Sequence, residues 1–340
     1  MNSKISLWAC YLLVFGLAVS FNAWNAPVNF EQAKVESRKN VYGDQTKSGS
    51  GTLYCGCDWQ WVGKSGGRVN LASCGYHVRS QQTRAERIEW EHIVPAWVFG
   101  HQRQCWQNGG RKNCVDTDPG FRVIESDMHN LAPSIGEVNS DRSNFGYGMV
   151  ARNIPNMYGA CSSKVDFKSR LFEPRDRVKG MVARINFYMH DRYNLTMSRR
   201  QQQLMMAWDS QYPVDAWERK RDNRIARSMG HHNPFVTGSK KWEVRHKNSV
   251  QGLVAQKSLV SQKSASKLNN LHAENNSTPS KKIASKTVHG ETIKGNKNSQ
   301  IYHFEHCSGY KIVADKNAVY FRSEAEARKT GYHLAGNCKK

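Results

Sequence analysis

The sequence predicts an α+β fold with a disulfide-rich first half, a helical second half and a small C-terminal module. Six of the nine cysteines lie between residues 55 and 161, in a stretch with little helical periodicity. Apolar residues recur at spacings of three and four between residues 178 and 189, as on one face of a helix. After residue 238 the composition shifts to Lys, Ser and Asn, and a dense set of aromatic residues returns after residue 300.

The first half is rich in Gly, Asn and Cys, which favours loops between short strands. We expect strands at 53–62 and 84–94, with long loops that disulfides hold in place. Residues 134–144 are interpreted as a short helix that Ser134 caps, because Glu137 follows three residues later.

The second half is expected to be helical. The apolar positions of its first predicted helix are Val178, Met181, Val182, Ile185 and Met189. Ser198 is expected to cap a second helix, which Pro213 ends. Asp215 is expected to cap a third helix, with Glu218 completing a capping box and Gly230 ending it.

Four segments follow from these patterns. Residues 1–20 are interpreted as a signal peptide, because Lys4 precedes an apolar run that is shorter than the ~20 residues of a membrane span. An uncleaved anchor is the alternative, and no other segment is apolar enough to span a membrane. Residues 21–238 form the main predicted domain, 239–300 a basic disordered linker with eleven Lys and three Glu, and 301–340 a small module. Because of the predicted signal peptide, we expect the protein in the periplasm or outside the cell.

The net charge of +22 favours polyanionic partners, namely nucleic acid, an anionic membrane or an acidic glycan. Nucleic acid is favoured among these because tryptophans lie among the basic residues, as Trp106 does near Arg103 and Arg111. The charge itself carries no information about the fold.

Eight cysteines remain after the predicted leader, and an even number in an exported chain predicts disulfides. The candidates are Cys55, Cys57, Cys74, Cys105, Cys114, Cys161, Cys307 and Cys338. Cys55 and Cys57 are one residue apart and should have different partners. The absence of any Cys-x-x-Cys pair argues against a zinc cluster.

The segment 87–95 embeds two acids and a histidine in an apolar, strand-like stretch. Strand alternation places Trp90 and His92 on one face, and Glu89 and Glu91 on the other. A strand end or bulge near Pro95 could bring Glu91 and His92 toward one site. On these residues alone, a buried structural pair and a functional site are equally good interpretations.

Downstream motifs favour the functional site. The chain resembles the bacterial endonuclease I family, periplasmic or secreted nucleases with a ββα-metal finger, over the leader and residues from about 40 to 236. The matching pieces, in order, are Glu89-Trp90-Glu91-His92-Ile93-Val94-Pro95-Ala96-Trp97, Gly109-Gly110-Arg111-Lys112-Asn113-Cys114, Asp127-Met128-His129-Asn130-Leu131 and Gly136-Glu137-Val138-Asn139. The second piece is expected to be a basic loop that ends at a cysteine.

The resemblance implies hydrolysis of DNA, and also of RNA, without strong sequence preference. It implies that Glu91 and Asn139 hold one Mg²⁺ ion, a hard cation that prefers oxygen ligands, with Mn²⁺ or Ca²⁺ as substitutes. His92 would take a proton from the attacking water, and Arg111 would bind the scissile phosphate. The products would carry 5′-phosphate and 3′-hydroxyl ends. A two-metal mechanism is the alternative, but it needs more clustered carboxylates than this segment offers.

Supporting roles are expected around this site. The resemblance implies that the stretch at Glu125 supports the histidine through a backbone carbonyl, whereas its side chain is expected in a structural salt bridge. Asn130, with His129, is expected to orient the finger. We expect Glu89 to face a structural partner, and the protein to be a monomer.

The C-terminal module resembles a small zinc-binding module of the Ada type, through Tyr302-His303-Phe304-Glu305-His306-Cys307 and the pattern that follows it. His303 and Ala335 replace two of its four cysteines, so we expect a disulfide between Cys307 and Cys338, with a mixed metal site as the alternative. For the whole chain, the competing functions are a non-catalytic DNA-binding protein and a glycan-binding envelope protein.

Overall fold

The computed structural model describes residues 26–47, 50–253, 293–297, 299–321, 323–335 and 338. The chain divides into two compact units, one within residues 1–258 and one within residues 259–340. The predicted signal peptide and most of the predicted linker lie outside the described residues. No helix among the described residues is both long and apolar enough to cross a membrane.

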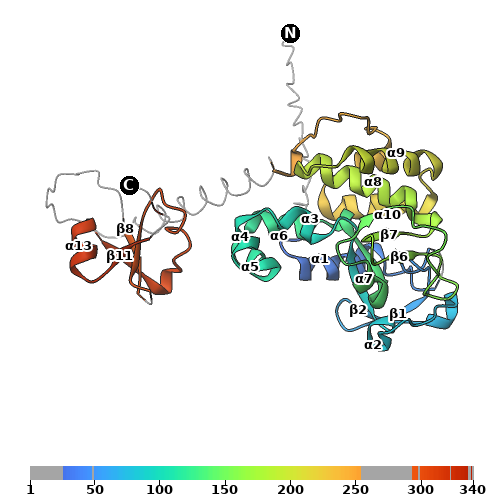
Figure 1. The fold of residues 1–340 in the computed structure, drawn as a ribbon, viewed down its shortest axis with the longest axis horizontal. Coiled ribbons are helices and arrows are strands. Elements are labelled where there is room, and N and C mark those ends of the chain that lie inside the picture. The colour runs from blue at the N-terminus through green and yellow to red at the C-terminus, as the bar shows by residue number, and fades with distance from the viewer. Residues whose placement is uncertain are drawn as a thin grey trace, which may run out of the picture. The chain divides into compact units, whose positions relative to one another are not determined.

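The first half of the larger unit combines short helices with two small antiparallel strand pairs (Figure 1). Its elements are α1 (Phe30–Glu36), η1 (Ser37–Val41), β1 (Trp59–Val62), β2 (Gly66–Val69), η2 (Leu71–Cys74), α2 (Gln82–Ala85), β3 (Ile88–His92), α3 (Ala96–Gly100), α4 (Gln104–Gln107), α5 (Gly110–Thr117), α6 (Pro119–Glu125), η3 (Met128–Asn130), β4 (Leu131–Ile135) and α7 (Gly136–Arg142).

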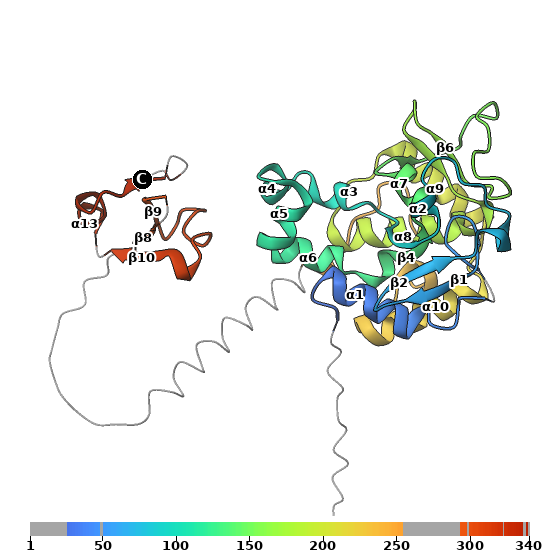
Figure 2. The same cartoon turned by 90° about the horizontal axis from the view of Figure 1, so that it is seen from below.

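The second half of this unit is mainly helical. Its elements are β5 (Gly146–Tyr147), β6 (Lys164–Asp166), β7 (Leu171–Glu173), α8 (Asp176–Tyr193), α9 (Arg199–Gln211), α10 (Ala216–Met229) and α11 (Pro234–Thr237). Figure 2 shows α8, the longest of these helices, running through the middle of the unit, with the β1–β2 pair and α10 toward one side. The α+β class, with many disulfides and a helical second half, is confirmed.

The three helices expected in the second half are present, with the expected caps. The Ser198 side chain accepts a hydrogen bond from the Gln201 backbone at the start of α9. Asp215 caps α10 in the same way, and Gly230 ends that helix in the left-handed conformation. Glu218 does not complete a capping box, because its carboxylate forms a buried ion pair with Arg184.

The first half departs from the prediction in four places. The strand expected over 53–62 is confined to its last four residues, and the one expected over 84–94 is preceded by α2. The basic segment that contains Arg111, expected to be a loop, is the start of helix α5. Ser134 does not cap α7, because it lies in β4 and the helix begins only at Gly136.

Strands β3 and β4 pair antiparallel, from Ile88 opposite Ile135 to His92 opposite Leu131. Helix α7 follows β4 directly and packs against both strands. The carboxylate of Glu137, in the first turn of α7, accepts hydrogen bonds from the backbone N–H groups of residues 79–81 and from a tyrosine hydroxyl. This network fixes the helix beside the strands.

All eight candidate cysteines form disulfides. The pairs are Cys55–Cys161, Cys57–Cys74, Cys105–Cys114 and Cys307–Cys338. Cys55 and Cys57 therefore have different partners, as expected from their spacing. The first pair joins residues 106 positions apart, and so connects the start of the domain to the segment before β6.

The described residues of the smaller unit contain a four-stranded sheet and one α-helix. Its elements are β8 (Ile293–Asn296), β9 (Ile301–Phe304), η4 (Asp315–Asn317), β10 (Ala318–Phe321), α13 (Glu324–Lys329) and β11 (His333–Leu334). The strand order is β10-β8-β9-β11, and only the β9–β11 pair is parallel. Tyr302 and Phe321 form its core with Ile293 and Ala327.

The predicted linker is too long at both ends. Trp242 is buried and stacks on Phe187 with ring centroids 4.9 Å apart, so the larger unit continues past residue 238. At the other end, β8 begins at Ile293 and pairs with two strands of the small sheet. The many polar and basic residues of these segments concealed both contacts.

Candidate active site

His92 ends strand β3 with its side chain almost fully buried. Its Nε2 lies 2.8 Å from the backbone carbonyl oxygen of Glu125. Since a carbonyl only accepts, Nε2 carries the proton, and the lone pair of Nδ1 remains for another partner. Burial lowers the pKa of His92 to about 3, and the positive charges of Arg111, Arg142 and Lys34 add to this shift. The ring is therefore neutral at physiological pH.

The same residue that orients His92 also holds Arg111. The buried carboxylate of Glu125 accepts a hydrogen bond of 2.7 Å from Nε of Arg111. Arg111 lies in the first turn of α5, and 44% of its side chain is exposed. Its terminal guanidinium nitrogens can therefore contact a ligand. The structure brings His92, Glu125 and Arg111 together, although Glu125 lies more than 30 residues after His92 in the sequence.

Glu91 precedes His92 and is also buried. One carboxylate oxygen, Oε1, accepts a hydrogen bond of 2.8 Å from the hydroxyl of Tyr54 and lies 3.1 Å from Nη1 of Arg142. Burial raises the pKa of Glu91, and the charge of Arg142 opposes that effect. The positive charge of Arg142 therefore offsets part of the cost of burying a carboxylate next to the histidine in the chain.

Sequence reasoning missed the role of Arg142. Its guanidinium also donates hydrogen bonds to the backbone carbonyls of His92 and Ile93, the latter at 2.6 Å. The hydroxyl of Tyr147 donates to the same Ile93 carbonyl and bonds to the hydroxyl of Tyr54. This buried network fixes the end of β3, and the sequence signals it only by an arginine at the end of the predicted short helix.

Asn139 lies on α7, and its Nδ2 donates a hydrogen bond of 2.9 Å to Glu89 rather than to Glu91. Glu89 also pairs with Arg84 and Arg87, so it faces structural partners, as expected. Residues three apart lie on one face of a helix, and residues two apart lie on one face of a strand. Two residues of α7 can therefore face two residues of β3. Asn139 contacts Glu89, and Arg142, three positions later on α7, contacts Glu91.

The residues present suit a hard cation. Among the described residues, no hydrogen bond engages Oε2 of Glu91 or Oδ1 of Asn139. Through their other polar atoms, the Glu91 side chain contacts α7 and the Asn139 side chain contacts β3. A carboxylate oxygen and an amide oxygen are ligands that Mg²⁺ accepts, and Mg²⁺ usually keeps several waters besides one or two protein ligands.

Asn130 anchors the chain just beyond His92. Its carboxamide accepts from the Val94 backbone N–H at 2.7 Å and donates to the Val94 carbonyl at 2.9 Å. Its own backbone carbonyl accepts from Ile93. Asn130 thus holds the turn after β3 from both sides, without contacting the candidate catalytic groups.

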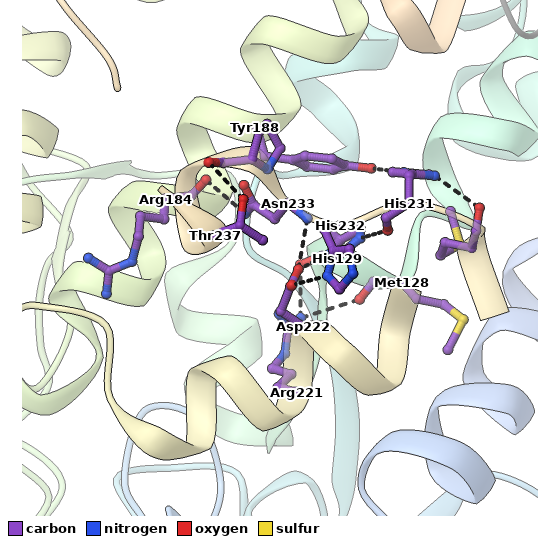
Figure 3. A network of polar contacts seen from close by, with 12 residues as sticks. Met128, His129, Arg184, Tyr188, Arg221, Asp222, His231, His232, Asn233 and Thr237 are labelled. Atoms are coloured by element: carbon purple, nitrogen blue, oxygen red, sulfur yellow. Dashed lines mark hydrogen bonds and ion pairs between the residues drawn. The ribbon is translucent and has the colours of Figure 1, made fainter. Parts of the chain in front are cut away.

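His129 belongs to a separate buried polar cluster (Figure 3). Its Nε2 lies 3.1 Å from the carbonyl oxygen of His231, and its ring approaches Asp222 of α10. Asp222 in turn bonds to His232. The cluster joins η3, which contains Asn130, to the helical half of the domain.

Comparison with known proteins places this geometry in a family. The family model described as endonuclease I matches residues 29–240. The chain is 45% identical to "Endonuclease-1" of Buchnera aphidicola subsp. Baizongia pistaciae over 236 residues, which cover 68% of this chain and 93% of that protein.

Two proteins of Aeromonas hydrophila are each 50% identical over 186 residues, or 54% of this chain. They are an "Extracellular deoxyribonuclease", of which 81% is covered, and a "Periplasmic deoxyribonuclease", of which 77% is covered. Such relatives agree with the export expected from the leader and the disulfides. The chain therefore belongs to the endonuclease I family: it is an endonuclease, a hydrolase of the periplasm or the extracellular space.

Proposed function

We propose that this endonuclease hydrolyses phosphodiester bonds of DNA with one Mg²⁺ ion and without strong sequence preference. The observation that carries the proposal is that Glu125 contacts both His92 and Arg111. Glu91, which precedes His92 in the chain, and Asn139 of α7 offer oxygen donors for the metal. The deoxyribonuclease relatives support DNA as the substrate. RNA is a second expected substrate, because attack by water on phosphorus does not use the 2′ position of the sugar.

His92 acts as the general base in this mechanism. With its Nε2 proton donated to the Glu125 carbonyl, Nδ1 accepts a proton from the attacking water. In the protein without bound DNA, the low pKa of His92 makes it a weak base. A phosphate anion bound beside Arg111 would offset the positive field and raise that pKa toward neutrality.

Arg111 binds the scissile phosphate through its terminal nitrogens, while Glu125 holds Nε and so fixes the plane of the guanidinium. Glu91 and Asn139 would hold Mg²⁺, which would stabilise charge on the leaving 3′ oxygen. The products would then carry 5′-phosphate and 3′-hydroxyl ends, and a monomer contains every group required.

The test is plasmid degradation by the oxidised protein with Mg²⁺, with EDTA, and with the variants His92→Ala and His77→Ala. His77 is exposed and serves as the matched control. We expect the parent and His77→Ala to cut only with metal. His92→Ala should lose about 10²–10⁴ in rate and still bind DNA. Cleavage by His92→Ala at the parental rate would rule out the general base.

A DNA-binding protein without activity is the competing function. It predicts binding by both the parent and His92→Ala and cleavage by neither, whatever metal is supplied. The intact set of His92, Arg111, Glu91 and Asn139 argues against it.

A further inference from the structure

Helix α1 lies against the candidate catalytic residues, although none of its residues belongs to the motifs of the site. The ring of Phe30 contacts the ring of His92, with centroids 4.7 Å apart and planes tilted by 41°. The chain just before α1 is fixed in place, because the buried Ser126 hydroxyl donates a hydrogen bond of 3.0 Å to the Pro27 carbonyl. Ser126 directly follows Glu125, so α1 is attached to the same segment that orients His92.

Phe30 also contacts two cations. The guanidinium carbon of Arg111 lies 5.3 Å from the centre of the ring, and the ammonium nitrogen of Lys34 lies 4.8 Å from it. Such contacts between a cation and an aromatic face are attractive. Phe30 therefore touches the proposed general base, the proposed phosphate-binding arginine and a second cation.

The ammonium group of Lys34 is available to a ligand. It pairs at 2.7 Å with Glu31; the side chain of Lys34 is 19% exposed and that of Glu31 is 79% exposed. An ion pair within one helix whose carboxylate lies at the surface contributes little to stability, so a stronger anion can replace Glu31. Arg111, by contrast, is held by a buried carboxylate and cannot move freely.

We propose that α1 is part of the active site, with Lys34 binding a backbone phosphate next to the scissile one and Phe30 positioning Arg111 and His92. The inference rests on the proposed function for the identity of the scissile phosphate. Its basis is that both cations lie within 5.3 Å of the centre of one ring that also touches His92. Consecutive phosphates on a strand, which rise 3.4 Å along the helix axis, can engage two such cations together.

The role of Lys34 is tested by the salt dependence of DNA binding, measured on a His92→Ala background so that no cleavage is needed. Each lost phosphate contact lowers the slope of log K against log salt by about 0.9 for duplex DNA. We expect this loss for Lys34→Gln, recovery with Lys34→Arg, and the parental slope for Lys39→Gln. Lys39 is an exposed lysine shortly after α1 and serves as the matched control.

A slope for Lys34→Gln equal to that of its parent would overturn the phosphate site. This outcome is distinct from failure of the proposed function, which would appear as absent cleavage in protein with His92 intact. Binding and its salt slope would still be measurable in that case.

The role of Phe30 is tested by a split between kcat and KM in the full chain. Phe30→Ala should lower kcat about 10-fold or more, because small displacements of catalytic groups are costly, while KM changes little. Phe30→Tyr keeps the ring and should restore kcat. A parental kcat in Phe30→Ala would overturn the positioning role. The role would also be overturned if Phe30→Tyr folded with the parental melting temperature but did not restore kcat.

Discussion

Replacing Arg142 with methionine should lower the free energy of unfolding by about 3–5 kcal/mol, the cost of leaving one partner of a buried ion pair alone. The side chains of Arg142 and Glu91 are 1% and 3% exposed, so water cannot replace the lost cation. The substitution also removes the donors to the carbonyls of His92 and Ile93. Methionine fills a similar volume, so the loss reports on charge and hydrogen bonding more than on packing.

The assay is urea and thermal denaturation of the oxidised protein at pH 7. In a domain of this size, each kcal/mol of lost stability lowers the melting temperature by about 2–4 °C. The expected loss therefore lowers the melting temperature by about 6–20 °C. Arg87→Met is the matched control, because Arg87 is 52% exposed and pairs with Glu89 at the surface. Exposed pairs contribute at most about 1 kcal/mol. Equal losses in the two variants would refute the assignment of a buried, stabilising pair.

Three further outcomes follow from the structure, two from the site and one from a buried histidine of α8. Arg111→Lys should lower kcat by about 10²-fold with little change in KM, because an ammonium cannot bind Glu125 and phosphate in the geometry of a guanidinium; steady-state kinetics on a short duplex would measure this. Asn139→Ala should raise the Mg²⁺ concentration for half-maximal activity by about 10-fold or more, and a metal titration of parental shape would contradict the ligand assignment. Burial lowers the pKa of His190 to about 4, so the unfolded chain binds more protons than the native one between pH 6.5 and 4, and stability falls as the pH falls. His190→Gln should remove about 3 kcal/mol of that loss at pH 4, as urea denaturation at pH 7 and pH 4 would show.

The sequence was informative where local chemistry determines structure. The caps Ser198, Asp215 and Gly230 satisfy or end helix backbones within a few residues, and all three lie where expected. Strand alternation also predicts correctly that Glu89 and Glu91 share a face, because α7 meets both.

Local sequence patterns gave wrong or missing predictions where contacts with distant segments determine the structure. Ser134 lies three residues before a glutamate, as a helix cap does, but it belongs to β4 because that strand pairs with β3. The burial of Glu91 depends on Tyr54 and Arg142, which lie 37 residues before it and 51 after it. The contact of Phe30 with His92 likewise joins segments that no spacing rule connects.

The bridge between Cys55 and Cys161 has a consequence for the cell that makes this enzyme. Tyr54, which bonds to Glu91, is adjacent to Cys55, and its backbone carbonyl accepts a hydrogen bond from Ser163, two residues beyond Cys161. In the reducing cytoplasm this bridge does not form, so the hydroxyl that supports Glu91 lacks its anchor. The producing cell's own chromosome would then meet only an incomplete enzyme, and oxidation after export would serve as the activating step.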